Sequence, residues 1–347
     1  MKGRIMFKQF LKVLLVAAVV LAVFCGISFA QGNRDAAFEH VRQVHARNTN
    51  RLLATKGIQG SAVGMDLMDK PVVMVFAAGH GIAGIPDEID DVPVQVVVTG
   101  KFYAKDKPEN PGNGGGKKKI DPTSRFERPV PIGVSTGNAN SCSAGTIGCK
   151  VIDGDGNAYA LSNNHVFALE NTAQLGDEII QPGLIDTGCT YDPLNVLGSL
   201  FAYVPIVFGA ENTVDAAIAS VPDGNLGNST PSDGYGTPKS TSVAAEVNQS
   251  VQKYGRTSSL TKGTVTGIDA NVMVGYGGRD ALFVGQIIVE SRKPFILPGD
   301  SGSLLVTKSH KEPVGLLFAG NSTGQMAVAN PIDDVLAAFG VTIDGKE

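Results

Sequence analysis

From Pro131 onward, the sequence is a succession of short apolar runs separated by turn-forming residues. The runs are rich in Val, Ile, Ala and Leu, and the turns in Gly, Asn, Asp and Ser. Short strands at this spacing are typical of an all-β barrel or sandwich. The strands that we expect are Thr146–Ile152, Val196–Val204, Asp215–Val221, Gly263–Val274, Leu282–Glu290, Gly302–Thr307 and Pro313–Ala319, followed by a helix over Ile332–Phe339.

A segment of different composition precedes this β region. Residues 105–128, "KDKPENPGNGGGKKKIDPTSRFER", contain many Gly, Pro and Lys residues and almost no apolar side chains. Such a segment buries too little apolar surface to offset its ordering entropy. We therefore expect a flexible linker over 104–130 and a separate domain over 131–347.

The residues before the linker predict a small α+β unit over 31–103. Apolar residues recur at helical spacing in 33–56, and three strands are expected at Ser61–Leu67, Pro71–Ala77 and Val94–Thr99. Two interpretations of this unit remain open. It is either a pro-region that assists folding and is removed near the basic linker, or an accessory module that binds a partner.

Residues 1–30 have the composition of a bacterial secretory signal peptide. Four basic residues precede an apolar stretch, Val13–Val23, and small residues precede an expected cleavage at Gln31. Removal of this segment changes the formal net charge from −4 to −8, because it contains four basic and no acidic residues. An acidic chain has little attraction for nucleic acid, and no later apolar run is long enough to span a bilayer. We expect a secreted or periplasmic protein without a membrane span.

Three cysteines follow the expected cleavage site: Cys142, Cys149 and Cys189. An oxidising compartment permits disulfides, but an odd count leaves at least one thiol over. We expect at most one bridge, and the sequence does not choose its partners. Because no histidine accompanies these cysteines at zinc-ligand spacing, we expect no metal and no cofactor.

Three polar motifs interrupt the apolar runs. "LSNNHV" contains His165 at the end of the strand-like run Ala158–Leu161, and "NTVDAAIASV" opens an apolar strand with Asp215. "LPGDSGSLL" contains Ser301 in a tight glycine-rich turn. The order His, Asp, Ser is the order of the catalytic residues in chymotrypsin-type proteases.

The chemistry of a serine hydrolase needs these three residue types. A serine hydroxyl is a weak nucleophile and requires an adjacent base, and a histidine of near-neutral pKa can take its proton. A buried carboxylate orients the imidazole. The backbone N–H groups of Gly299 and Ser301 can converge on one point as an oxyanion hole, and glycine at 299 permits the required backbone geometry.

These motifs resemble the chymotrypsin-like serine peptidases, and most closely the bacterial streptogrisin-like branch and related Asn-Asn-His-Val trypsin-like proteins. The resemblance covers residues 131–345 and is carried by "IGVSTGNANSCSAGTIGCKV", "VQKYGRTSSLTKGTVTGIDANVMVGYGG", "PGDSGSLL" and "VGLLFAGN". It implies an all-β fold of two six-stranded antiparallel barrels of chymotrypsin type. His165 and Asp215 would come from the first barrel and Ser301 from the second, with the active site in the cleft between them.

The resemblance also implies residues around the nucleophile. Asp300 would form a buried ion pair that shapes the oxyanion loop, with Arg256 as the expected partner and Lys253 behind it. The substrate side chain would contact five residues: Phe295, Phe318, Ala319, Gly320 and Asn321. The absence of an acidic residue near Phe295 favours an apolar or small substrate side chain.

Two departures from the family pattern are informative. Streptogrisins have a cysteine directly after the histidine, whereas this chain has Val166, so Cys142 lacks its family partner. Ser301 is followed by Gly-Ser rather than Gly-Gly. The expected function is that of a secreted serine endopeptidase acting on peptides or proteins. The alternative is a catalytically silent trypsin-like protein that binds a partner. The sequence assigns neither the natural substrate nor the oligomeric state.

Overall fold

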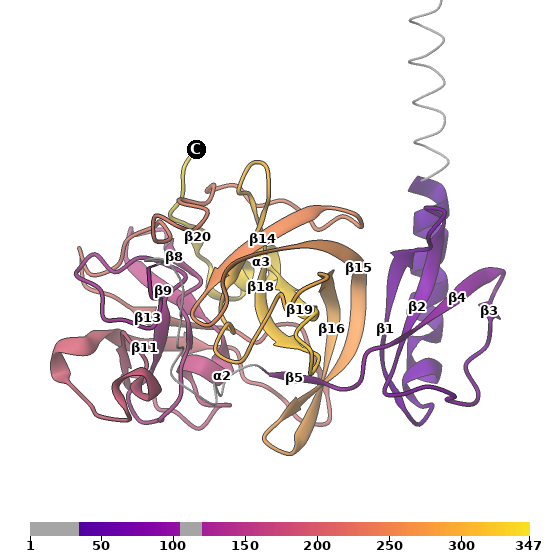
Figure 1. The fold of residues 1–347 in the computed structure, drawn as a ribbon, viewed down its shortest axis with the longest axis horizontal. Coiled ribbons are helices and arrows are strands. Elements are labelled where there is room, and N and C mark those ends of the chain that lie inside the picture. Colours follow the sequence, from indigo (N-terminus) through magenta and orange to yellow (C-terminus); the bar gives the residue numbers. More distant parts are fainter. Residues whose placement is uncertain (1–34, 105–119) are drawn as a thin grey trace, which may run out of the picture.

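The computed structural model describes residues 35–104 and 120–347 (Figure 1). The expected signal peptide and residues 105–119 of the expected linker lie outside the described residues. Strands dominate the described residues and form a 12-stranded and an 8-stranded sheet. Within these residues, none of the helices combines the length and apolar character that a membrane crossing requires.

The 8-stranded sheet contains the first barrel. β7 and β8 are two halves of one strand, because Ile147 N donates to Val134 O on one side and Gly148 N donates to Leu161 O on the other. Antiparallel pairing runs from β7 through β6, β10, β11, β13 and β9 back to β8, which closes the barrel. The strands are β6 (Ser135–Asn138), β7 (Gly145–Thr146), β8 (Cys149–Ile152), β9 (Ala158–Ser162), β10 (Glu178–Ile180), β11 (Val196–Tyr203) and β13 (Ala217–Ser220), with β20 (Thr342–Ile343) beside β8.

The second barrel is a closed ring within the 12-stranded sheet. Each strand pairs antiparallel with the next in the order β14, β15, β16, β19, β18, β17 and back to β14. The strands are β14 (Ser250–Gly255), β15 (Ser259–Tyr276), β16 (Arg279–Glu290), β17 (Leu304–Thr307), β18 (Pro313–Gly320) and β19 (Met326–Pro331). The expected closing helix is α3 (Ile332–Phe339). The expected two six-stranded antiparallel barrels are therefore confirmed.

The N-terminal unit continues the sheet of the second barrel. Its β1 pairs antiparallel with β15, so β15, β1, β2 and β4 lie side by side (Figure 1). The unit contains a helix over 35–53 and β1 (Ile58–Met65), β2 (Pro71–Ala77), β3 (Glu88–Ile89), β4 (Val92–Val98) and β5 (Phe102–Ala104). Val41 and Val44 of the helix pack with Val63, Val73 and Val75 of the sheet. The expected α+β unit is confirmed.

Strand β18 lies where three apolar clusters meet. All eight of its residues are buried. Leu316 packs in the cluster of the first barrel, and Leu317 packs in that of the second barrel and the N-terminal helix. Phe318 packs in a third cluster, which the N-terminal sheet shares with β15 and β16. The last residues of β18 are therefore placed at the junction of both barrels and the N-terminal unit.

Strand β5 leaves the N-terminal sheet and crosses to this junction (Figure 1). It pairs in parallel with the end of β15 and antiparallel with the end of β18. In the second pairing, Ala104 lies opposite Ala319 and Tyr103 opposite Gly320. The N-terminal unit thus contacts the second barrel at two separate places, one through β1 and one through β5.

Residues 120–130 differ from the flexible linker that composition predicts, because they lie against the first barrel. Phe126 N donates to Gln181 Oε1 at 3.0 Å, and Val130 N donates to Asn225 O at 2.8 Å. Val130 is also almost fully buried. Backbone hydrogen bonds hold much of this segment, and an argument from apolar content alone does not include them.

Candidate active site

His165 and Asp215 come together because β9 and β13 are antiparallel neighbours. Ser162 at the end of β9 lies opposite Ala217 at the start of β13. His165 follows in the short helix α2 (Asn164–Phe167), and Asp215 precedes β13 by two residues. The chain therefore delivers both side chains to the same end of the first barrel.

The imidazole and the carboxylate form a short, buried contact. His165 Nδ1 lies 2.5 Å from Asp215 Oδ2, and His165 N donates to Oδ1 at 3.2 Å. Neither side chain is exposed. An ionised carboxylate only accepts hydrogen bonds, so the proton is on Nδ1. Nε2, on the far side of the ring, is then the basic nitrogen.

Asp215 has three further hydrogen-bond partners, two of which sequence patterns did not indicate. Tyr276 Oη, from the second barrel, donates to Asp215 Oδ2 at 2.8 Å. Asn163 Nδ2 donates to the Asp215 carbonyl at 2.7 Å, and Asp215 N donates to Asn330 Oδ1 at 3.1 Å. These partners hold both the side chain and the backbone of Asp215. Only Asn163 had a sequence signal, since it belongs to the motif that contains His165.

Ser301 contacts residues of both barrels. The hydroxyl donates to Phe318 O at 3.1 Å, and Thr146 N donates to Ser301 O at 2.8 Å. A Cβ on Gly145 would lie 2.5 Å from Val166 Cγ2 and 3.1 Å from Ser301 O. Val166, which follows His165, and the Ser301 backbone thus contact the same small residue of the first barrel. The structure brings the three expected residues to the boundary between the barrels.

The two peptides that precede Gly299 and Ser301 are both held by their carbonyl groups. Thr257 Oγ1 donates to Pro298 O at 2.6 Å, and Ser303 N donates to Asp300 O at 3.0 Å. In a trans peptide the N–H points away from the C=O. Holding the carbonyls therefore sets the directions of the N–H groups of Gly299 and Ser301, the two expected oxyanion donors.

The partner of Asp300 is Lys253, which corrects the expectation of Arg256. Lys253 Nζ lies 2.9 Å from Asp300 Oδ2, and both side chains are fully buried. Burial alone raises the pKa of a carboxyl. The Lys253 charge and hydrogen bonds from Ser258 and the Leu297 N–H outweigh it and lower the pKa of Asp300.

Arg256 instead forms an ion pair with Asp186 of the first barrel. The strand β14 ends at Gly255, so Arg256 lies in the following turn, while Lys253 is within the strand. Residue spacing alone did not distinguish the two cations. Which of them reaches Asp300 depends on where β14 ends.

The residues expected around the substrate side chain are only partly brought together. Phe318, Ala319 and Gly320 end β18, and Asn321 follows directly. Phe295 is different, because its buried side chain packs in the core of the second barrel.

The edge of β18 at Ala319 and Gly320 is covered by β5. Ser301 and Asp215 have no exposed surface in this arrangement, and the His165 residue as a whole, backbone included, is 3% exposed. The described chain thus has its expected catalytic residues closed off from solvent.

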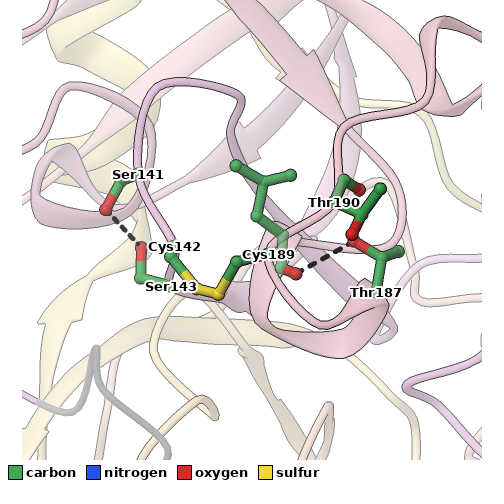
Figure 2. Close-up of a disulfide and its surroundings, with 7 residues drawn as sticks. Ser141, Cys142, Ser143, Thr187, Cys189 and Thr190 are labelled. Carbon is green, nitrogen blue, oxygen red and sulfur yellow. Dashed lines mark hydrogen bonds between the residues drawn. A yellow bond between two sulfur atoms is a disulfide. The ribbon is translucent and has the colours of Figure 1, made fainter.

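One disulfide joins Cys142 to Cys189, with a Cα–Cα distance of 5.2 Å (Figure 2). Cys142, for which the resemblance to streptogrisins left no partner, is therefore paired with Cys189. Cys149 is a free, buried thiol, and burial raises its pKa. Sequence reasoning limited the number of bridges to one but did not choose the pair.

Residues 35–104 and 120–347 contain no cluster of side chains that could bind a metal ion. No group of three or more His, Cys, Asp or Glu side chains is placed there to hold an ion.

No protein-family model and no curated protein matches the chain. Solved structures resemble it. A glutamic acid-specific serine protease is 23% identical, with a TM-score of 0.45, and the match covers 62% of this chain and 100% of that one. Thermobifida fusca Protease A is 17% identical, with a TM-score of 0.45 and coverage of 62% and 98%. Cellulomonas bogoriensis chymotrypsin is 20% identical, with a TM-score of 0.43 and coverage of 62% and 99%. Similarity at this level does not assign a function to this chain.

Proposed function

We propose that this protein is a serine endopeptidase whose catalytic residues are His165, Asp215 and Ser301. The observation that carries the proposal is the buried 2.5 Å contact between His165 Nδ1 and Asp215 Oδ2 beside the Ser301 turn. A carboxylate on Nδ1 leaves Nε2 as a base, and it stabilises the imidazolium that forms when the base takes a proton. With His165 as the base and Ser301 as the nucleophile, the reaction is an acyl transfer to a serine hydroxyl.

The reaction follows from these roles. His165 Nε2 takes the proton of Ser301 as Oγ attacks the peptide carbonyl carbon. The carbonyl oxygen becomes an oxyanion, which the N–H groups of Gly299 and Ser301 stabilise. His165 then returns the proton to the leaving amine as the C–N bond breaks. Water, with its proton taken by His165, attacks the acyl-enzyme, the ester bond to Ser301 Oγ breaks, and His165 returns the proton to Oγ as the acid leaves.

The substrate that fits this proposal is an extended peptide. An extended chain can pair its backbone with the open edge of a strand, and the edge at Ala319 and Gly320 lies next to Phe318, whose carbonyl contacts the Ser301 hydroxyl. In the full chain β5 already pairs with this edge. A substrate and β5 would therefore compete for the same backbone groups.

This competition favours a pro-region as the role of the N-terminal unit. While β5 is paired with β18, a substrate has no access to the edge. Cleavage after β5 and loss of the unit would open it. An accessory module that stays attached would have to release β5 before the site could work. We further propose export through the segment 1–30, which fits a protease that acts outside the cytoplasm.

A fluorophosphonate probe tests the function. We expect Ser301 to be labelled in the processed protein, and labelling to disappear in His165→Ala although Ser301 remains. An inert wild type that nevertheless folds would favour the alternative, a catalytically silent protein that binds a partner. Mass spectrometry of the exported protein tests the role of the N-terminal unit, with a start near Pro131 expected for a pro-region.

A further inference from the structure

The peptide that carries the Gly299 N–H is held by two linked side chains. Thr257 Oγ1 lies 2.6 Å from Pro298 O and 3.0 Å from Arg256 Nη1. A guanidinium only donates hydrogen bonds. The Thr257 hydroxyl therefore accepts from Arg256 and directs its own proton to Pro298. The donor and the acceptor are therefore fixed in both hydrogen bonds, the one from Arg256 to Thr257 and the one from Thr257 to Pro298.

Arg256 is itself held by a carboxylate of the first barrel. Its Nε donates to Asp186 Oδ2 at 3.0 Å, and Nη2 donates to Oδ1, so the contact is bidentate. Both side chains are buried. Ser135 Oγ donates to Asp186 Oδ2 at 2.6 Å. A bidentate pair fixes the plane of the guanidinium as well as its position, and this one crosses the boundary between the barrels.

The disulfide anchors the segment that contains Asp186. Asp186 lies in the 3₁₀ helix η1 (Leu184–Thr187), and Cys189 N donates to Leu184 O at 2.8 Å directly after it. Cys189 is bonded to Cys142, in the loop between β6 and β7 (Figure 2). The end of η1 is thus tied covalently to the first barrel.

Gly299 lies close to Thr257 and Arg256, with little free space around its Cα. Its φ is +94°, and a Cβ at this position would lie 2.6 Å from Thr257 Oγ1 and 2.9 Å from Arg256 Cδ. Thr146 Oγ1, also from the first barrel, donates to Gly299 O at 2.8 Å. The carbonyls on both sides of Gly299 therefore have hydrogen bonds that lead to the first barrel.

We propose that Asp186, Arg256 and Thr257 are positioning residues that orient the Gly299 N–H toward the oxyanion. The effect on rate rests on the proposed function, whereas the effect on the loop does not. Without the Thr257 hydroxyl, the peptide between Pro298 and Gly299 loses the bond that sets its plane, and its N–H is no longer held toward the oxyanion. Loss of one oxyanion donor costs about 10²–10³ in rate, so a misdirected donor should cost at least roughly tenfold.

Two substitutions at Thr257 test this role. Thr257→Val keeps the shape but removes the hydroxyl, and we expect kcat to fall roughly tenfold or more with KM unchanged. A peptide boronate, which forms a tetrahedral adduct with Ser301, should bind weaker by the same factor, while a product peptide should bind as before. Thr257→Ser keeps the hydroxyl and should restore kcat. If the role of Thr257 were purely structural, Thr257→Val would change thermal stability without lowering kcat at an unchanged KM.

Asp186→Asn tests the far end of this series of hydrogen bonds, which runs from Asp186 through Arg256 and Thr257 to the Pro298 carbonyl. Asp192→Asn is its matched control. Arg125 and Asp192 form an exposed pair in the same barrel, with Nη1 and Oδ2 3.5 Å apart. We expect Asp186→Asn to lower kcat as Thr257→Val does, and Asp192→Asn to leave it unchanged. If Asp186→Asn fails to fold, Thr257→Val still decides the question.

Hydrogen exchange in the full chain separates this inference from the proposed function. We expect the amides of residues 299–302 to exchange about tenfold faster in Thr257→Val than in the wild type. Faster exchange in a protein that is inert to substrate and fluorophosphonate would support the positioning role and remove the protease function. Unchanged exchange in Thr257→Val, or an unchanged kcat in an active protein, would overturn the inference.

Discussion

The ammonium of Lys253 lies 2.9 Å from the carboxylate of Asp300, and neither side chain has any exposed surface. Asp300 Oδ1 also accepts hydrogen bonds from the N–H groups of Thr257 and Ser258 at 2.9 and 3.1 Å. The residue before Ser301 is thus fixed by one buried charge and several donors. This arrangement uses only residues of the second barrel, whereas the hydrogen bonds at the Pro298 and Gly299 carbonyls lead to Asp186 and Thr146 of the first barrel.

Lys253→Met should lower the free energy of unfolding by about 3–5 kcal/mol at neutral pH, because it leaves a buried carboxylate without its partner. The wild-type pKa of Asp300 is below its ordinary value of 3.8. A carboxyl whose pKa is lower in the folded than in the unfolded state stabilises the folded protein at pH values above its unfolded-state pKa. This stabilisation is lost as the pH falls through the folded-state pKa. The wild type should therefore keep it down to about pH 4.

Urea unfolding at a series of pH values measures this effect. The deficit of Lys253→Met should shrink toward acid pH, where its unpaired carboxyl takes a proton. A deficit that is constant with pH would contradict the prediction. Lys150→Met is the control, because Lys150 and Asp344 are also 2.9 Å apart but partly exposed. It should cost at most about 1 kcal/mol.

Tyr276→Phe should reduce turnover roughly tenfold, because it removes a buried hydrogen bond to the Asp215 carboxylate. With one donor fewer, the carboxylate interacts more strongly with the His165 imidazolium. The acid limb of the kcat/KM profile should therefore move to higher pH. Tyr191→Phe is the control, since the Tyr191 hydroxyl donates to Glu178 on the surface. Equal profiles for the wild type and both variants would rule out a role for Tyr276.

Gly299→Ala should abolish labelling of Ser301 by a fluorophosphonate. The new Cβ would collide with Thr257 Oγ1 at 2.6 Å, and the φ of +94° disfavours any side chain. Gly278→Ala separates these causes, because Gly278 has a φ of +102° but no atom near its Cβ position. We expect Gly278→Ala to lose stability and keep full labelling. Retained labelling in Gly299→Ala would show that the loop tolerates displacement.

Phe102→Ala should increase labelling of Ser301 in the unprocessed chain. Phe102 is 1% exposed and packs edge-to-face on Phe76, with the ring centroids 5.8 Å apart. A buried Phe→Ala substitution typically costs about 3–5 kcal/mol, which should loosen β5 from β18. Tyr103→Ala is the control, because the Tyr103 side chain is 45% exposed. Labelling rates of the full chain, measured with processing blocked, would show no difference if β5 does not cover the site.

Several strands could be predicted because the sequence pattern is local. Pro71–Ala77 has the same bounds in the sequence prediction and in the structure, as does the helix Ile332–Phe339. Other strands were missed. Ser250–Gly255, for example, contains Gln252 and Lys253, and both are buried. A strand that buries a charged side chain beside an ion-pair partner has no apolar alternation to reveal it.

The sequence by itself determined the β texture and the short polar motifs that carry His165, Asp215 and Ser301. These properties depend on residues that are close together in the chain. Only the tertiary structure decided that Lys253 pairs with Asp300, that Cys142 pairs with Cys189 and that β5 lies on β18. Each of these contacts joins separate elements, and its partner is chosen by which strands are neighbours and where each strand ends.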